Sequence, residues 1–224
     1  MTDQPSPPSP PAAVPAQRNE KDQKSSYADE YRFVAHVRHV CQESPGARAA
    51  LRSGLGKAVD DCTRMHWVIA DLVPETDRRY EMTERAYYTI AAMIASAPEH
   101  SEKSTAAQTT AEQNKSRRNF GECLADAVQD GLIRENSAEA RLRLLTKQST
   151  GGLHRHLPSS VRIVGGRFEI ADWVRLLVDL RSWDVDRPRI TRRWLQSFYR
   201  ARLRTARDAA DAADIAEHAT GPAQ

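Results

Sequence analysis

Large apolar side chains recur every three or four residues through most of this sequence, and this spacing constrains the fold more than any other feature. The clearest run is Trp173, Leu176, Leu177 and Leu180. Residues at positions i, i+3, i+4 and i+7 share one face of an α-helix. Shorter or similar stripes are Phe33, Val37 and Val40; Tyr87, Ile90, Ala91 and Ile94; Leu124 and Val128; Leu142 and Leu145; Leu153, Leu157, Val161 and Val164; and Ile190, Trp194 and Phe198. The spacing therefore predicts an all-α protein.

Local signals indicate where several of these helices begin and end. The pair Ser44-Pro45 predicts a helix start, with the serine as N-cap and the proline at the first helical position. Gly54 and Gly56 would end that short helix. Asp172 is the candidate cap of the helix with the clearest stripe, and the last long helix is expected to begin near Pro188.

One segment allows two interpretations. Gly165-Gly166 separates Arg162-Ile163-Val164 from a second short apolar run, Arg167-Phe168-Glu169-Ile170. Two strands joined by two glycines are typical of a β-hairpin. A helix that ends at Gly165 fits almost as well, and neither alternative changes the predicted fold class.

Three segments lack an apolar period and divide the chain. Residues 1–26 hold six of the twelve prolines, so we expect a disordered tail there. Residues 99–118 are polar, and because a loop of about 20 residues is unusual in a compact domain, we expect a mobile insertion or a link between two lobes. Residues 206–224 are rich in Ala and Asp and predict a frayed helix that leads into a disordered tail. The chain is thus expected to form two helical lobes, 27–130 and 131–205.

Charge is distributed unevenly between these parts. Residues 1–130 and 206–224 each carry a net charge of −3, whereas residues 131–205 hold 16 Lys and Arg against 7 Asp and Glu, a net of +9. All but one of those cations, Lys147, are arginines, whose planar guanidinium groups suit phosphate oxygens. A basic segment in a nearly neutral chain indicates a polyanionic partner. A solvated helical surface is the alternative.

Membrane and secreted proteins are disfavoured by the composition. No apolar run approaches the ~18–20 residues of a membrane-spanning helix, and the first 26 residues contain no apolar signal-peptide core. The three cysteines, Cys41, Cys62 and Cys123, are too few to suggest a disulfide framework. We therefore expect a soluble, cytoplasmic protein with no membrane partner.

The residues of an enzyme site are not evident either. Gly54-x-Gly56 lacks the third glycine and the preceding strand of a phosphate-binding loop, and no serine stands in a Gly-x-Ser-x-Gly elbow. His and Cys residues within 36–41, 62–66 and 154–156 have loosely metal-like spacings, but none completes a zinc set. We expect no catalysis, metal, cofactor or small-molecule substrate. Four aromatic residues at helical spacing are assigned to the core rather than to a base-stacking surface: Trp173, Trp183, Trp194 and Tyr199.

The helices also carry a set of motifs in a fixed order. The first are Gly46-Ala47-Arg48-Ala49-Ala50-Leu51-Arg52-Ser53-Gly54-Leu55-Gly56, Glu84-Arg85-Ala86-Tyr87-Tyr88-Thr89-Ile90-Ala91, Asn119-Phe120-Gly121 and Glu139-Ala140-Arg141 with Leu144-Leu145. The later ones are Leu153-His154-Arg155-His156-Leu157, Asp172-Trp173, Leu176-Leu177, Asp179-Leu180, Trp183-Asp184, Trp194 and Phe198-Tyr199. Over about residues 30–203 this order resembles the CasB-type small subunit of the type I-E CRISPR surveillance complex, Cascade.

The resemblance implies a non-catalytic, all-α protein of antiviral defence. Such subunits pair as a dimer beside the backbone subunits that carry the guide RNA, and they help to hold the target DNA strand and the displaced strand of the R-loop. The implied partners are the large and backbone subunits, a second copy of the chain, the guide RNA and both DNA strands. Because the guide reads the sequence, the protein's own contacts are expected to go to phosphates.

Ten cationic residues are candidates for these contacts. The resemblance implies that role for Arg48, Arg52, Arg85, Arg141 and Arg155. Charge and position alone add Arg143, Lys147, Arg162, Arg192 and Arg193. Internal ion pairs are the alternative for Arg48, for Arg85 with Glu81 or Glu84, and for Arg141 with Glu139. Capping and core roles are assigned to Asp172, Asp179, Trp173, Trp183 and Trp194.

Two other functions remain as alternatives. A helix-turn-helix regulator needs a compact turn between two short helices. The nearest candidate, Arg52–Gly56, is followed by Asp60-Asp61, where a DNA groove would require cations. The third function is a structural bundle whose basic face docks an acidic protein partner.

Overall fold

The computed structural model describes residues 27–97 and 118–219. These residues form helices and connecting segments and none of them lies in a strand, which confirms the all-α prediction. The predicted N-terminal tail and nearly all of the predicted insertion lie outside the described residues. The longer helices are α2 (Ala28–Glu43), α3 (Pro45–Arg52), α6 (Glu81–Ser96), α7 (Phe120–Gln129), α8 (Glu135–Thr146), α9 (Thr150–Val164), α10 (Ile170–Arg181) and α11 (Trp183–Ala219). Shorter helical turns are η1 (Val59–Asp61), α4 (His66–Ile69), η2 (Ala70–Leu72), α5 (Glu75–Arg78) and η4 (Gly165–Arg167).

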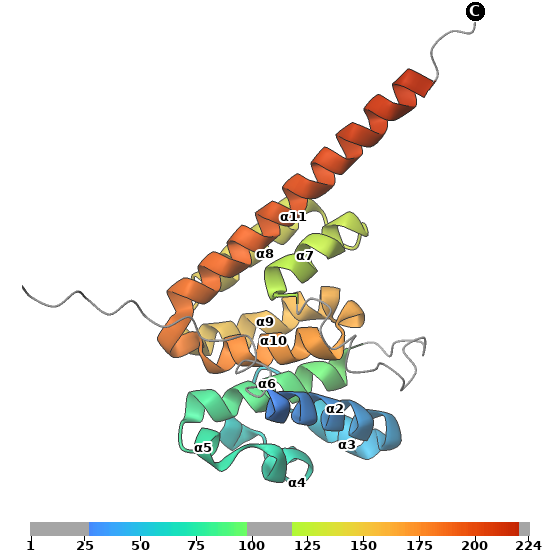
Figure 1. The fold of residues 1–224 in the computed structure, drawn as a ribbon. Helices are drawn as coiled ribbons and strands as arrows, with labels where there is room; N and C mark the ends of the chain where they lie inside the picture. The colour runs from blue at the N-terminus through green and yellow to red at the C-terminus, as the bar shows by residue number, and fades with distance from the viewer. Residues whose placement is uncertain (1–26, 98–117, 220–224) are drawn as a thin grey trace, which may run out of the picture.

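The helices are arranged in layers (Figure 1). Helices α2 to α5 lie at one end, α6, α9 and α10 cross the middle, and α7, α8 and α11 form the other end. Residues 86–95 of α6 are all buried, as expected for a helix with neighbours on every side. Helix α6 packs against α2, α3, α9 and α10. The ring of Phe33 on α2 meets Tyr87 on α6 edge to face, with centroids 4.9 Å apart.

Helix α11 packs along α7 over most of the length of α7. Gly121 permits this contact, because a Cβ at that position would lie 1.9 Å from the carbonyl oxygen of Trp194. Trp194 also packs against Phe120 and Trp183, with ring centroids 5.1 and 5.2 Å apart. The core roles predicted for Trp183 and Trp194 are confirmed, as is that of Trp173.

The helix starts agree only in part with the local signals. Ser44 caps α3 as predicted, and its Oγ accepts a hydrogen bond of 3.2 Å from the N–H of Ala47. The prediction of Asp172 as an N-cap is wrong by one turn, because α10 begins at Ile170 with Glu169 as its N-cap. Asp172 stands at the third helical position and accepts a hydrogen bond of 3.0 Å from the backbone N–H of Glu169, which completes a capping box.

The last helix largely agrees with the expectation. A kink at Asp186, where the backbone leaves the helical conformation (φ −120°), divides α11 into a short first part from Trp183 and a long part that begins next to Pro188, as predicted. The proline is tolerated because it stands in the first turn after this kink. The C-terminal half of α11 projects beyond the bundle (Figure 1) and runs to Ala219. Residues 206–219, where the sequence predicts a frayed helix, are helical, and the rest of the predicted tail lies outside the described residues. Alanine has the highest helix propensity of all residues, which explains why this exposed segment stays helical.

The hairpin interpretation of the glycine pair is wrong. Gly165–Arg167 form a 3₁₀ turn that follows α9 directly. Phe168 is then buried against Trp173, with ring centroids 4.8 Å apart. The chain then continues into α10 and does not turn back along a strand.

The packing does not follow a division of the chain after residue 130. Helix α7, which precedes that point, packs with α8 and α11, whereas α10, which follows it, packs with α2 and α6. One continuous apolar core includes residues of both parts. A bilayer-spanning helix, which must be both long and apolar, is not found within the described ranges.

Candidate nucleic-acid interface

Three of the predicted arginines meet at one groove. It has a volume of about 490 Å³ and lies between α8, α9 and the turn that follows α3. Neither aspartate nor glutamate is among its lining residues. We name it the arginine groove, and its residues are Leu55, Gly56, Arg141, Arg155, Pro158, Ser159, Arg162 and Ile163.

The sequence of α9 explains how two of these arginines reach the groove. Arg155, Ser159 and Arg162 are spaced four and three residues apart, so they share one exposed helix face. The other face carries the apolar stripe that sequence spacing predicts, and its members are buried: Leu153, Leu157, Val161 and Val164. Burial of that stripe orients the helix, and the orientation turns both guanidinium groups outward.

The groove arginines are not engaged by the protein itself. Arg141, Arg155 and Arg162 form no hydrogen bond or ion pair with any residue of the described ranges. The alternative partner of Arg141, Glu139, instead binds Arg143 at 2.6 Å. Because no lining carboxylate balances the three cations, the groove carries a positive potential that attracts anions.

The turn after α3 forms the opposite side of the groove. Gly56 adopts a positive φ of +76°, which other residues rarely do. This turn places Leu55 at the groove, where its side chain is 38% exposed. Arg52, the last residue of α3, is exposed three residues before Leu55 and has no ion pair within the described chain.

Arg48 is engaged inside the molecule. Its Nε donates to the carbonyl oxygen of Ala95, and a terminal N–H donates to that of Ala97, both at 3.1 Å. These carbonyls lie at the C-terminal end of α6, where a cation is favoured by the helix dipole. Arg48 therefore ties α3 to the end of α6, which supports the internal alternative for this residue.

Arg193 and Arg143 also contact internal partners. Arg193 binds Asp179 at 2.5 Å, and the same buried carboxylate accepts a hydrogen bond of 2.6 Å from the indole of Trp194. Arg143 contacts Glu139 and donates to the phenol oxygen of Tyr199 at 3.2 Å. Tyr199 is 37% exposed, so its predicted place in the core is wrong. Its hydroxyl group holds it at the surface.

Arg85 lies beside a buried histidine rather than a glutamate. It forms no ion pair with Glu81 or Glu84, and its Nε has no hydrogen-bond partner among the described residues. Burial, together with the nearby charge of Arg85, lowers the pKa of His154 to about 3. His154 Nδ1 lies 2.8 Å from Thr89 Oγ1. His154 is therefore neutral and structural, and Arg85 lies close enough to influence its pKa. The last two candidates, Lys147 and Arg192, are exposed outside the arginine groove.

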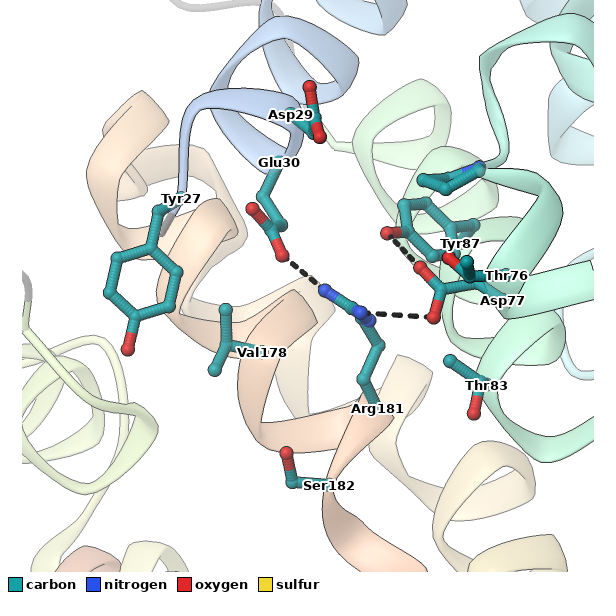
Figure 2. Close-up of a pocket in the computed structure, with 11 residues that line it drawn as sticks. Tyr27, Asp29, Glu30, Thr76, Asp77, Thr83, Tyr87, Val178, Arg181 and Ser182 are labelled. Carbon is teal, nitrogen blue, oxygen red and sulfur yellow. Dashed lines mark hydrogen bonds and ion pairs between the residues drawn. The ribbon is translucent and has the colours of Figure 1, made fainter. Parts of the chain in front are cut away.

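A second cavity shows what sequence reasoning missed (Figure 2). It has a volume of about 520 Å³, and Arg181 lies in it between Glu30 and Asp77. The guanidinium group contacts both carboxylates, at 2.9 Å for Asp77, and the Tyr87 hydroxyl group donates to Asp77 at 2.8 Å. Burial raises the pKa of Tyr87 above its usual range, so the phenol stays protonated. We name this the Arg181 cavity. Its partners come from α2, α5, α6 and α10, and no local pattern could have paired them.

The described residues contain no group of three or more His, Cys, Asp or Glu side chains placed to hold a metal ion. Burial raises the pKa of the three free thiols, Cys41, Cys62 and Cys123, which makes them weak nucleophiles.

The helix-turn-helix alternative requires a recognition helix after the turn at Arg52–Gly56. The first α-helix after this turn, α4, has only four residues, too few for a recognition helix.

Comparison with known proteins identifies relatives of this fold. The family model of the CRISPR-associated protein Cse2 matches residues 47–199. No curated protein was found to match the sequence. A chain of a CRISPR RNA-guided surveillance complex is 32% identical, with a TM-score of 0.67, and the alignment covers 82% of this chain and 98% of that chain. A chain of such a complex described as pre-nicking is 31% identical, also with a TM-score of 0.67, over 82% and 99% of the two chains.

A more distant relative has the same fold. The CasB protein of M. ruber is 23% identical, with a TM-score of 0.58, over 80% of this chain and 97% of that one. The family model spans well over half of the sequence and includes every helix that lines the arginine groove. The chain therefore belongs to the Cse2 family of CRISPR-associated proteins.

Proposed function

We propose that this protein is the non-catalytic small subunit of a type I-E Cascade complex, in which the arginine groove holds nucleic-acid strands through their phosphates. One observation carries the proposal: three arginines without internal partners line a groove that contains no carboxylate, in a chain of the Cse2 family. The similar chains come from CRISPR RNA-guided surveillance complexes. The proposed partners are the large and backbone subunits, a second copy, the guide RNA and the two DNA strands, all in the cytoplasm.

Phosphate contacts suit a subunit that meets arbitrary sequences. Contacts to phosphate oxygens position a strand without reading its bases, and in guided complexes the guide performs the reading. The groove arginines therefore stabilise the target and displaced strands whatever their sequence. Arg52 extends this surface along α3, whereas Arg48 and Arg193 are held by partners within the fold and the exposed Arg143 pairs with Glu139.

A reversal of charge in the groove tests the proposal. Binding of a labelled oligo-dT strand to the full chain is measured by fluorescence anisotropy over a range of salt concentrations. Three phosphate contacts on a single strand predict a slope of log K against log salt of about −2. The triple variant Arg141→Glu, Arg155→Glu and Arg162→Glu is expected to bind at least about tenfold more weakly and to lose most of this slope.

A second triple variant controls for net charge. Arg32→Glu, Arg79→Glu and Arg189→Glu change the total charge equally, at exposed positions outside the groove. This control is expected to retain most of the wild-type affinity. Equal losses in the two variants would refute the groove as the binding site. Salt-dependent capture of an acidic protein, without affinity for the strand, would favour the docking alternative.

A further inference from the structure

The arginine groove is not a uniformly polar surface. Besides the three cations, its lining includes the apolar residues Leu55, Pro158 and Ile163. Leu55 is 38% exposed to water. A groove that only bound phosphates would have no use for an apolar floor, since phosphate oxygens gain nothing from contact with carbon. The floor therefore indicates a ligand with an apolar part between its charged parts.

Shape supports the same conclusion. The groove volume of about 490 Å³ lies within the roughly 300–1,000 Å³ of sites that hold small organic ligands. Gly56 contributes no side chain, and the space where its Cβ would stand is open, with no atom within 4 Å. No side chain of Gly56 therefore narrows the groove at this turn.

One hydroxyl group is also positioned at the floor. Ser159 lies on α9 between Arg155 and Arg162, and its Oγ donates to the carbonyl oxygen of His156 at 2.8 Å. Because its proton is already engaged, the oxygen is left as an acceptor. A planar, apolar group that carries N–H donors and is joined to phosphates on both sides matches a nucleobase within a strand.

We propose that the arginine groove holds one unstacked nucleobase against Leu55, Pro158 and Ile163 while its arginines bind the flanking phosphates. This inference rests on the proposed function and adds a selectivity to it. In a duplex every base is stacked and paired, so only a single strand can supply the base. The groove therefore selects single-stranded over double-stranded nucleic acid, with little preference among bases, because every base has an apolar face.

Three probes with the same number of phosphates distinguish binding of a base from binding of phosphates alone. They are an oligo-dT strand, an abasic strand with the same sugar-phosphate backbone, and a duplex. The full-length protein is expected to bind oligo-dT at least about fivefold more tightly than the abasic strand, the lower end of measured base-stacking effects. It is also expected to bind the duplex more weakly than oligo-dT.

Two variants of Leu55 report on the floor. Leu55→Ser is expected to reduce the preference for oligo-dT over the abasic strand, because Pro158 and Ile163 remain, and to leave the salt slope unchanged, because the arginines remain. Leu55→Tyr is expected to increase the preference for oligo-dT, because an aromatic ring stacks on a base better than leucine does. A gain of this kind cannot come from misfolding, and circular dichroism verifies that both variants fold.

The results distinguish failure of the base-binding inference from failure of the proposed function. If wild-type protein binds oligo-dT and the abasic strand equally, with a steep salt dependence, the base-binding inference is wrong and the proposed function stands. Tighter binding of the duplex would overturn the inference in the same way. If no probe binds with a salt dependence, the proposed function fails and the inference fails with it.

Discussion

Two cavities of similar volume use arginine in opposite ways. In the Arg181 cavity, one guanidinium group is held by two carboxylates that are more than nine-tenths buried, Glu30 and Asp77. In the arginine groove, three guanidinium groups meet no carboxylate. The first arrangement satisfies its charges within the fold, whereas the second leaves them for an external anion. The surroundings of an arginine, and not its identity, thus decide whether it stabilises the protein or binds a partner.

The largest expected effect follows removal of the cation from the Arg181 cavity. Arg181→Met leaves Glu30 and Asp77 buried without a positive partner. Breaking one side of a buried ion pair lowers the free energy of unfolding by about 3–5 kcal/mol. Urea unfolding followed by circular dichroism measures this loss. The matched variant in the groove, Arg155→Met, is the control, and equal losses would contradict the distinction between the two cavities.

Two neighbouring residues of α9 show the same contrast between an internal and an available side chain. His154 is buried, whereas Arg155 is exposed. The folded protein lowers the pKa of His154 from 6.5 to about 3. The unfolded chain therefore takes up a proton first as the pH falls, so this stability is complete above pH 6.5 and declines toward pH 3. We expect the free energy of unfolding to fall by about 2 kcal/mol between pH 7 and pH 5.

Thermal and urea unfolding at a series of pH values test this. His154→Gln keeps a neutral polar group and removes the titration, so its stability is expected to change much less between pH 7 and pH 5. A wild-type profile that is flat in this window would show that His154 is not held neutral by the fold.

A smaller loss is expected at Arg48, which the sequence places among the binding candidates. Arg48→Met removes two charge-assisted hydrogen bonds to the end of α6, and such bonds contribute about 1.5–3 kcal/mol. Because the site is only half-buried and water can replace part of the contact, we expect a loss near the lower end. Binding of oligo-dT is expected to stay close to wild type. A loss of binding at unchanged stability would place Arg48 in the interface.

The smallest effect on stability is expected in the groove itself. Arg155→Met removes no internal contact, so its free energy of unfolding should change by about 0.5 kcal/mol or less. Its salt slope for single-strand binding should nevertheless fall by about 0.7, the contribution of one phosphate contact. Anisotropy titrations at several salt concentrations measure the slope, and an unchanged slope would remove Arg155 from the interface.

The sequence predicted much of this architecture because its signals are local. The stripes on α6, α9 and α10 identified those helices, and Ser44 marked the start of α3. The errors arose where a local pattern fits more than one structure. The glycine pair at 165–166 fits a hairpin or a helix end, and the structure has a 3₁₀ turn there. Likewise, Asp172 fits an N-cap but stands at the third position of α10.

The sequence also predicted only part of the candidate site. Arg141, Arg155 and Arg162 were all identified from motif or charge, and the fold brings them to one groove. The same reasoning could not separate them from Arg48 and Arg193, because an arginine on an amphipathic helix has the same local pattern in both cases. The sequence also offered no reason to select Leu55 as a candidate, because only the fold brings Leu55 to the groove beside α9.

By itself, the sequence determined an all-helical chain with a basic second half, since helical periodicity and net charge are properties of neighbouring residues. Only the tertiary structure decided which cations remain available to a partner. Arg48 and Arg181 find their acceptors about 50 and 100 or more positions away in the chain, so the folded arrangement alone could show that they are engaged. The groove arginines, in contrast, form no hydrogen bond or ion pair with the described residues, so they remain available to a partner.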